Sequence, residues 1–510
     1  MPLMRIPYTA PLPPPTILPT SASTLPGAVA ALADFLRPPN PSTTTPNGKT
    51  VILSGAGISV ASGLADYRGS NGTYTLNKTY RPIYYHEFCA SHEARKRYWA
   101  RSFLGWTNLH KSRPNKAHHA VGQLGEMGIL SSVITQNVDS FHLSAHPGLR
   151  TLELHGYLRS TVCLSCRTEY SRESFQQDLA ALNPSWAVFL AEMLSSGALS
   201  TENPVERRLK GLKTNPDGDV DVPGVEYTTF RYPSCPACLA NPPTGTKVQQ
   251  SRDGAWKPTS TAGVLKPAVI MFGESIPDPV KLAVETAVDE ADRILVLGSS
   301  LATYSAWRLV RRAQEMGKPV GVANLGGVRG EEQFFAKVAA GGLGREGVRC
   351  SLPLEELLPA LVERLRVGTE VTTTLATKLA QTLDQADALH VTLVPTRYLP
   401  TRDRGGLVQD HTLRIIIRYP VTDRLAAACW NEPTSSSVAV IYVGITTNPA
   451  ATGRAIADGG LRMIADTEHR SPWRLRDLTI PPGNNWWQLC GEGRRKSLDQ
   501  VASEKGPTSF

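Results

Sequence analysis

Short apolar runs alternate with amphipathic stretches through the first two thirds of the chain. Apolar runs of about four to eight residues predict buried strands, and longer stretches with helical periodicity predict helices. The predicted strands are Thr50–Ser54, Ser132–Thr135, Thr151–Leu154, Val264–Phe272, Arg293–Leu297 and Pro319–Ala323. The predicted helices cover residues 86–106, 115–127, 279–290, 303–317 and 353–366. This alternation predicts an α/β fold with a doubly wound, Rossmann-like parallel sheet.

Changes in character along the chain predict its domains. Residues 1–25 are rich in Pro, Ser and Thr and are interpreted as a disordered or targeting tail. Residues 26–366 form the main domain, and a cysteine-bearing stretch at about 157–262 interrupts it as an inserted small module. Residues 367–510 are an extension of unknown role. It is a β-rich domain, a species-specific extension or sequence from an incorrect gene prediction, and its β-like runs lie near 390–394, 412–419 and 438–443.

The composition excludes several classes of protein. Hydrophobic residues make up 41% of the chain and charged residues 19%, which is ordinary for globular proteins and rules out wholesale disorder. No apolar stretch reaches the length of about 18 residues that a membrane-spanning helix needs. The net charge of +9 is spread over 510 residues without a basic patch, so nucleic-acid binding is not expected.

Four of the eight cysteines form two C-x-x-C pairs. The pairs are Cys163 with Cys166, and Cys235 with Cys238. Four thiolates can enclose one zinc ion tetrahedrally, which predicts a structural zinc site in a reducing compartment. Unpaired buried thiols are the main alternative. A catalytic zinc is disfavoured because no ligand position is left open.

A turn with two glycines follows the first predicted strand. Glycines at a strand end let the backbone approach a pyrophosphate, although a plain tight turn has the same sequence. Val60 stands where a third glycine would complete G-x-G-x-x-G, and Ala61 follows it, so an ordinary Rossmann dehydrogenase is disfavoured. In the next loop Arg68 could bind a phosphate or form a surface salt bridge with Asp66. The candidate residues of this segment are Gly55, Ala56, Gly57, Ser59, Asp66, Tyr67 and Arg68.

Polar residues also follow the next two strands. The segment after Ser132–Thr135 holds Gln136, Asn137, Val138 and Asp139. Its amides and carboxylate can bind a carboxamide or a ribose hydroxyl, or serve only as a turn and cap. His155 ends the following strand, where an imidazole suits general base catalysis; a structural histidine is the alternative.

Two small polar turns follow the last predicted strands of the sheet. Both are suited to the ribose and phosphate of an adenosine. Because the carboxyl ends of parallel strands share one edge of a sheet, five polar strand ends together predict a dinucleotide-binding crevice. The turns consist of Gly298, Ser299 and Ser300, and of Asn324, Leu325 and Gly326.

Taken in order, several motifs resemble the sirtuin family over about residues 26–366. They are GAGIS, SGLADYR, TQNVD, ELHG, the two C-x-x-C pairs, KPAVIMFGE, GSS and NLG. The segment RYWAR, followed by Gly105-Trp106, is similar to the class II branch of that family. The resemblance implies an NAD-dependent protein lysine deacylase of the deacetylase type, which transfers the acyl group to ADP-ribose and releases nicotinamide. A protein ADP-ribosyltransferase or a lipoamidase is the alternative on the same scaffold.

The resemblance also implies roles for individual residues. The loop from Gly55 to about Tyr74 would wrap NAD⁺, and His155 would be the general base, with Asn137 and Asp139 as further catalytic residues. Gln136 would flank the nicotinamide with them. The turns after the last strands would take the adenosine side. Cys350 would lie near the adenine, and Val269–Glu274 would pair with an extended acyl-lysine peptide. Where the family has proline before the loop aspartate, this chain has Ala65.

The cofactors that the resemblance implies are NAD⁺ and one structural Zn²⁺. The partner would be an acyl-lysine protein or peptide, with no direct nucleic-acid or membrane partner, and the protein would be a monomer. A mitochondrial matrix location is expected, with a nuclear or cytoplasmic location as the alternative. The terminal segment lacks acidic residues, as transit peptides do, but Arg5 is its only basic residue.

Overall fold

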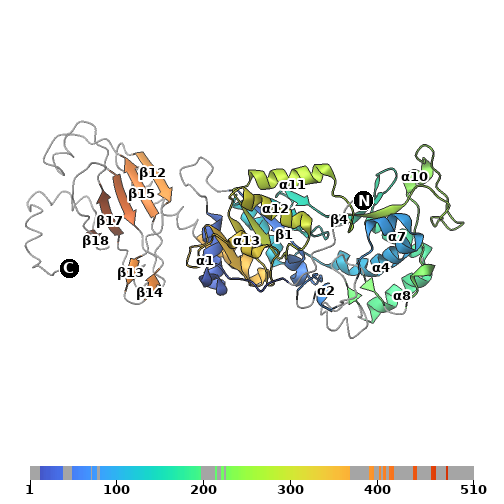
Figure 1. Ribbon diagram of the computed structural model, residues 1–510, viewed down its shortest axis with the longest axis horizontal. Coiled ribbons are helices and arrows are strands. Elements are labelled where there is room, and N and C mark those ends of the chain that lie inside the picture. The colour runs from blue at the N-terminus through green and yellow to red at the C-terminus, as the bar shows by residue number, and fades with distance from the viewer. Residues whose placement is uncertain are drawn as a thin grey trace, which may run out of the picture. The chain divides into compact units, whose positions relative to one another are not determined.

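In the computed structural model the chain forms two compact units (Figure 1). In the first unit the structure describes residues 12–37, 49–69, 72–76, 81–196, 213–214, 220–222 and 225–367. In the second it describes the backbone of strands β12 (His390–Pro395), β13 (Thr401–Asp403), β14 (Gly406–Val408), β15 (Leu413–Arg418), β16 (Val440–Gly444), β17 (Leu461–Asp466) and β18 (Leu478–Ile480).

The second unit contains short antiparallel sheets. Strand β12 pairs with β15, β13 pairs with β14, and β17 lies between β16 and β18. Strands β12, β15 and β16 coincide with the three runs that the sequence pattern singled out.

A six-stranded parallel sheet forms the centre of the first unit, in the order β11-β10-β9-β1-β2-β3. The chain builds one half outward from β1 through β2 and β3, and later builds the other half through β9, β10 and β11. The topological switch point therefore lies between β1 and β9, which is where the predicted crevice is expected at the carboxyl ends of the strands. The strands are β1 (Thr50–Ser54), β2 (Leu130–Thr135), β3 (Thr151–Glu153), β9 (Arg293–Leu297), β10 (Val320–Ala323) and β11 (Gly347–Cys350).

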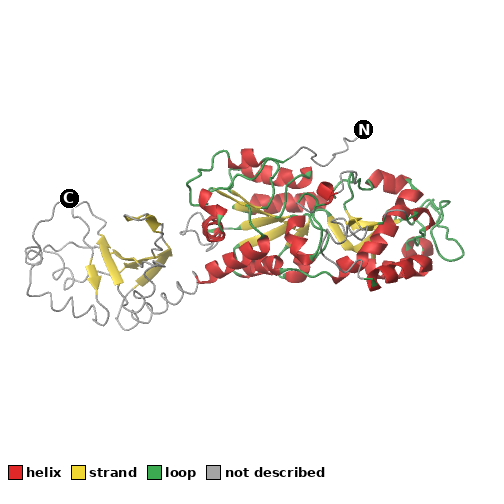
Figure 2. Cartoon of the chain, turned by 90° about the horizontal axis from the view of Figure 1, so that it is seen from below, coloured by secondary structure: helices red, strands yellow, loops and turns green. Residues whose placement is uncertain are grey.

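Helices cover both faces of this sheet, as the red helices around the yellow strands show (Figure 2). Along β1, Ile52 faces one apolar cluster, whereas Val51 and Leu53 face the other. The first cluster contains α1 (Leu25–Leu36), α5 (Lys116–Glu126) and the helix over residues 354–367. The second contains α11 (Asp278–Glu290), α12 (Tyr304–Glu315) and α13 (Glu331–Phe335). The predicted α/β fold with a doubly wound parallel sheet is confirmed.

A third apolar cluster forms a small module beside the main sheet. Its sheet has the order β5-β4-β8, and both pairings are antiparallel. The strands are β4 (Gly156–Cys163), β5 (Glu169–Ser171) and β8 (Leu265–Val269). The helices are α3 (Tyr85–Ala90), α4 (His92–Lys111), α7 (Arg172–Leu182), α8 (Pro184–Ser195) and α10 (Pro236–Ala240). The shorter elements are β6 (Lys213–Thr214), β7 (Val220–Asp221) and the 3₁₀ helix η3 (Tyr227–Thr229).

The expectation that Val264–Phe272 belongs to the main sheet was wrong, because β8 pairs with β4 of the small module. A short apolar run has the same signature in either sheet, so the pattern could not assign it. Helix α4, which the pattern placed between strands of the main sheet, also packs in the small module through Trp99 and Phe103.

Part of the segment that was interpreted as a tail lies against the main sheet. Leu18 forms an antiparallel bridge with Arg349 of β11, and the 3₁₀ helix η1 (Thr20–Ser23) then leads into α1. Residues 1–11 lie outside the described residues. Among the helices that the structure describes, none combines the length and apolar character needed to cross a membrane.

Candidate functional site

Glycines bring the ends of β1 and β9 into close approach. The Gly57 N–H donates to the carbonyl of Gly298 over 2.9 Å, and Gly298 has a φ of 60°, in the left-handed region. A Cβ atom on Gly57 would lie 2.8 Å from the Gly298 carbonyl oxygen, and one on Gly298 would lie 2.5 Å from the Ile58 nitrogen. These glycines are therefore needed for the two strand ends to meet, and the short 3₁₀ helix η2 (Ala56–Ser62) follows directly.

Gln136 links the ends of three strands. Its side-chain amide donates to the carbonyl of Ser54 at 3.2 Å and to the hydroxyl of Ser299 at 2.7 Å. Its amide oxygen accepts from the hydroxyl of Thr303, 3.2 Å away. The predicted residues Gln136 and Ser299 thus lie together, and Thr303 is a partner that the sequence analysis did not single out.

Asn137 and Asp139 converge on the hydroxyl of Ser59. That hydroxyl donates to the Asp139 carboxylate at 2.7 Å and accepts from the Asn137 amide at 3.1 Å. The Asn137 amide also donates to the carbonyl of Gly55. Burial raises the pKa of Asp139, and hydrogen bonds from the Phe141 backbone and from Ser59 oppose this rise. The structure brings together predicted residues that are about 80 positions apart in sequence.

His155 lies between β2 and the start of α12. Its Nδ1 is 3.1 Å from the carbonyl oxygen of Gln136, and its Nε2 is 2.8 Å from the hydroxyl of Ser305. A carbonyl only accepts, so Nδ1 carries the proton and Nε2 presents a lone pair. Burial lowers the pKa of His155 to about 4. At neutral pH this imidazole is therefore uncharged and can accept a proton at Nε2.

The loop after η2 folds back on its own acidic residue. The Asp66 carboxylate accepts from the Gly69 N–H at 3.1 Å, and burial raises the pKa of Asp66. The Arg68 guanidinium lies over the ring of Tyr74, 5.3 Å from its centroid. Tyr74 also stacks on Tyr67, and the short helix α2 (Thr73–Leu76) follows. Residues 70 and 71 of this loop lie outside the described part of the chain.

The second predicted turn of the adenosine side projects outward from β10. Leu325 is 62% exposed, and the Asn324 side chain donates to the carbonyl of Gly326 at 2.9 Å. Cys350 lies on the neighbouring strand, but its thiol is buried and donates to the carbonyl of Val322. The Cys350 backbone carbonyl accepts from the Asn324 N–H, so this residue contacts the turn through its backbone.

Behind the crevice lies a buried row of histidines that the sequence analysis missed. His142 of α6 (Phe141–Ala145) is 2.9 Å from the Ser54 hydroxyl through Nε2 and 2.9 Å from His146 through Nδ1. His118 of α5 packs against the ring of His142. Burial lowers the pKa of all three, that of His118 to about 3. These imidazoles carry no motif, because only the fold brings α5 and α6 together.

The four paired cysteines meet in the small module. Their sulfur atoms all lie within 4.8 Å of one another, with Cys163 and Cys238 at 3.5 Å and Cys166 and Cys235 at 3.7 Å. A tetrahedral ion with Zn–S distances of about 2.3 Å places its sulfurs roughly 3.8 Å apart, so the cluster fits zinc. Four thiolates would fill a tetrahedral coordination shell, which leaves no open position for catalysis, and three of the four residues are buried. The predicted metal ligands are thus together.

Comparisons with known proteins agree with this geometry. Residues 55–305 match the sequence profile of the Sir2 family. The chain is 38% identical over 302 residues to "NAD-dependent protein deacylase SIR4" of Batrachochytrium dendrobatidis, covering 58% of this chain and 87% of that protein. It is 36% identical to "NAD-dependent protein deacylase SRT2" of Arabidopsis thaliana, covering 58% and 70%. It is 33% identical to "NAD-dependent protein deacylase Sirt4" of Drosophila melanogaster, covering 57% and 78%.

The residues that match the family profile include most of the predicted crevice and the cysteine cluster. The matched profile begins at the first crevice glycine and ends at Ser305, the residue that faces His155. The predicted resemblance is confirmed. The chain belongs to the Sir2 family, whose members are the sirtuins.

Proposed function

We propose that this protein is an NAD-dependent protein lysine deacylase, with acetyl-lysine as the reference substrate. The observation that carries the proposal is the arrangement at His155. A neutral imidazole with its lone pair on Nε2 is held by the backbone carbonyl of Gln136, the residue that precedes Asn137 in the cluster of Ser59, Asn137 and Asp139. The names of the three relatives support the same activity.

The residues of the crevice have separate tasks in this reaction. Bound NAD⁺ would supply an electrophilic ribose carbon, whose bond to nicotinamide breaks as the acyl oxygen of the modified lysine attacks it. Asn137 and Asp139 would hold the nicotinamide ribose, and His155 would take a proton at Nε2 from a ribose hydroxyl. The Gln136 carbonyl keeps the other nitrogen of His155 protonated, which fixes the direction of that transfer.

The segment Val269–Glu274 is proposed as the binding site of the acyl-lysine peptide. The Ile270 N–H donates to the carbonyl of His155 at 2.7 Å, so this segment lies directly beside the proposed base. An extended peptide that pairs with it would bring its acyl group to the crevice.

A structural zinc ion would be held by the cysteine cluster, away from the reacting atoms. A mitochondrial matrix location stays a prediction of the sequence.

The test is nicotinamide release from NAD⁺ in the presence of acyl-lysine peptides. We expect the wild-type protein to release one nicotinamide for each peptide deacylated. His155→Ala is expected to lose at least about a hundredfold in kcat, the typical effect of a general base, while it still binds ADP-ribose. His119→Ala, an exposed histidine of α5, is the matched control.

Two outcomes would count against this proposal. Normal turnover by His155→Ala would remove the imidazole from the mechanism. Label transferred from NAD⁺ to a protein, without any deacylated lysine, would identify the ADP-ribosyltransferase alternative instead.

A further inference from the structure

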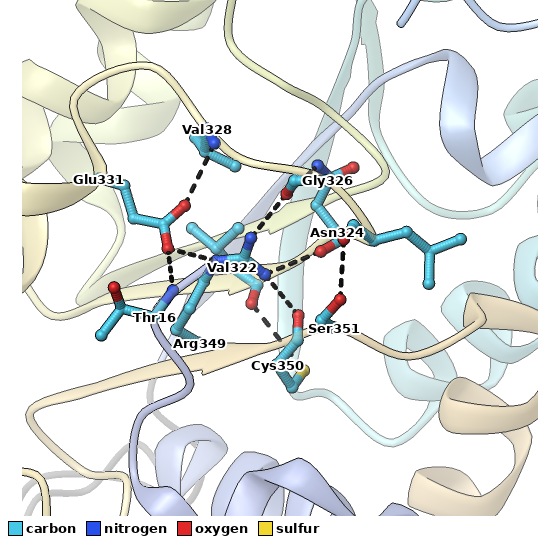
Figure 3. Close-up of polar contacts among 10 residues, drawn as sticks. Thr16, Val322, Asn324, Gly326, Val328, Glu331, Arg349, Cys350 and Ser351 are labelled. Atoms are coloured by element: carbon cyan, nitrogen blue, oxygen red, sulfur yellow. Dashed lines mark hydrogen bonds and ion pairs between the residues drawn. The ribbon is translucent and has the colours of Figure 1, made fainter. Parts of the chain in front are cut away.

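A buried ion pair lies behind the exposed turn Asn324–Gly326. Arg349 of β11 and Glu331 of α13 place Nε and Oε1 3.0 Å apart, and their side chains are 0% and 3% exposed (Figure 3). A pair this deeply buried is stable only when its remaining donors and acceptors find partners. The hydrogen-bond partners of Arg349 and Glu331 therefore identify the segments that the pair holds in place.

The guanidinium of Arg349 binds backbone carbonyls of the turn. It donates to the carbonyl of Asn324 at 2.8 Å and to that of Gly326 at 2.6 Å. The carbonyl of Leu325 accepts from the hydroxyl of Ser351 at 2.8 Å. Three consecutive carbonyls of the turn are thus bound by residues at the end of β11. We attribute the shape of the turn to these bonds, because Leu325 and Gly326 are exposed.

Glu331 connects the same pair to the beginning of the described chain. Its Oε1 also accepts from the backbone N–H of Thr16 at 2.8 Å, and its Oε2 accepts from that of Val328 at 3.1 Å. Leu18 exchanges two backbone hydrogen bonds with Arg349, of 2.9 and 2.6 Å. Residues 12–18, called the N-terminal strap below, are therefore fixed to both members of the ion pair, to Arg349 through Leu18 and to Glu331 through Thr16; Figure 3 shows the contact of Thr16.

A second contact joins the strap to the turn directly. A Cβ atom on Gly327, the residue that follows the turn, would overlap with the backbone carbonyl oxygen of Pro13. Only glycine lets the strap lie this close. The strap thus contacts the chain on both sides of Val328. Pro13 lies against Gly327, and the N–H of Thr16 donates to Glu331.

We propose that Arg349 is a positioning residue for NAD⁺ and that the N-terminal strap, acting through Glu331, helps to set the affinity of the crevice for adenosine. This inference rests on the proposed function and on the expectation, drawn from the family resemblance, that the turn Asn324–Gly326 takes the adenosine side. Arg349 touches no reacting atom. Disturbing it therefore changes the binding of the adenosine half of NAD⁺ and leaves the chemical step and the peptide site unchanged.

The first experiment replaces the guanidinium. For Arg349→Met we expect the KM for NAD⁺ and the Kd for ADP-ribose to rise about tenfold, which corresponds to roughly 1.4 kcal/mol. The kcat, the KM for an acetyl-lysine peptide and inhibition by nicotinamide should stay within about twofold of wild type. Arg349→Lys keeps the charge but loses the fork of donors, so it is expected to recover part of the affinity.

The second experiment removes a single N–H group. Thr16→Pro deletes the donor to Glu331 within a run that is already rich in proline, whereas Thr16→Ala keeps that donor. We expect Thr16→Pro to weaken ADP-ribose binding severalfold and Thr16→Ala to bind like wild type. Both variants leave the buried ion pair intact, so they test the inference even if Arg349→Met does not fold.

The outcomes separate this inference from the proposed function. Failure of the wild-type protein to bind ADP-ribose would overturn the proposed function. If the wild type binds, equal affinities of Thr16→Pro and Thr16→Ala would overturn the role of the strap. A folded Arg349→Met with an unchanged KM for NAD⁺, or with a lowered kcat alone, would overturn the role of Arg349.

Discussion

The two nitrogens of His155 have different partners, and only one of them could be anticipated. The sequence ELHG marks His155 at the end of a strand, which was enough to propose it as a base. The partner of its Nε2, Ser305, lies 150 residues further along and begins no recognisable motif. The same holds for Thr303, which binds Gln136 from 167 residues away. Contacts of this kind depend on how α12 docks, which no local pattern encodes.

Ser305→Ala should raise the pKa of His155. The hydroxyl donates to the lone pair of Nε2 and so favours the neutral imidazole, and without it protonation becomes easier. Because the base must be neutral, activity is lost as the pH falls through its pKa of about 4. We expect the acid limb of kcat/KM against pH to move upward by up to about one unit, since one hydrogen bond contributes about 1 kcal/mol.

The matched control is Ser305→Thr, which keeps a hydroxyl at the same place. An acid limb that stays where it was in Ser305→Ala, or one that moves to lower pH, would show that Ser305 does not hold the lone pair of Nε2.

At the scale of elements, the sequence pattern found most of the main sheet but missed its last strand. Strand β11 has only four residues, and Arg349 interrupts its apolar character. A charged residue in a buried strand argues against that strand unless its partner is known, and Glu331 becomes a partner only in the folded chain. The run of β8 was visible but ambiguous between the two sheets. Apolar patterns identify buried strands more readily than they identify their neighbours.

The metal ligands were predictable because their spacing is local and their chemistry is specific. The sequence pattern did not predict the full extent of the module around these ligands. Ser91 caps the N-terminus of helix α4, since its hydroxyl accepts from the Ala94 N–H, and the helix packs into the same cluster as Cys163 and Cys235. The module is therefore larger than the stretch between the cysteine pairs.

Replacing one cysteine of the cluster should release the metal. We expect purified wild-type protein to contain one zinc ion per chain and Cys238→Ala to contain less than about a tenth of that, because three thiolates rarely hold a structural ion. Elemental analysis by mass spectrometry measures this directly. Cys89→Ala changes an exposed cysteine outside the cluster and should keep its zinc. Equal zinc contents in the two variants would contradict the assignment.

At the scale of the whole first unit, the buried histidines of the crevice and of the histidine row make the free energy of unfolding depend on pH in the acid range. His118, His142 and His155 are held neutral by burial, with pKa values of about 3 and about 4 for the first and last. In the unfolded chain these groups take up protons below a pH of about 6.5. The unfolded state then binds more protons than the folded one, so stability decreases as the pH falls below this value.

The free energy of unfolding should therefore fall steeply between pH 6.5 and about 4. Each histidine that stays neutral in the folded protein contributes up to about 1.4 kcal/mol per pH unit in this window. Urea unfolding at several pH values measures the slope. His142→Gln should make the slope shallower, whereas His119→Gln on the exposed side of α5 is the control. A slope that is the same in wild type and His142→Gln would show that burial does not hold His142 neutral.

The position of β1 in the middle of the sheet has a consequence for synthesis on the ribosome. Strand β2 emerges soon after β1, but β9, its other neighbour, emerges only after the entire small module. Lys49 directly precedes β1 and Asp292 directly precedes β9, and the Lys49 N–H donates to the Asp292 carboxylate although the two residues are 243 positions apart in sequence. During that interval β1 would have no neighbour on one side, and its unpaired backbone groups could pair with another chain and cause aggregation. We therefore expect the nascent chain to be most prone to aggregation in the interval before its second half-sheet is translated.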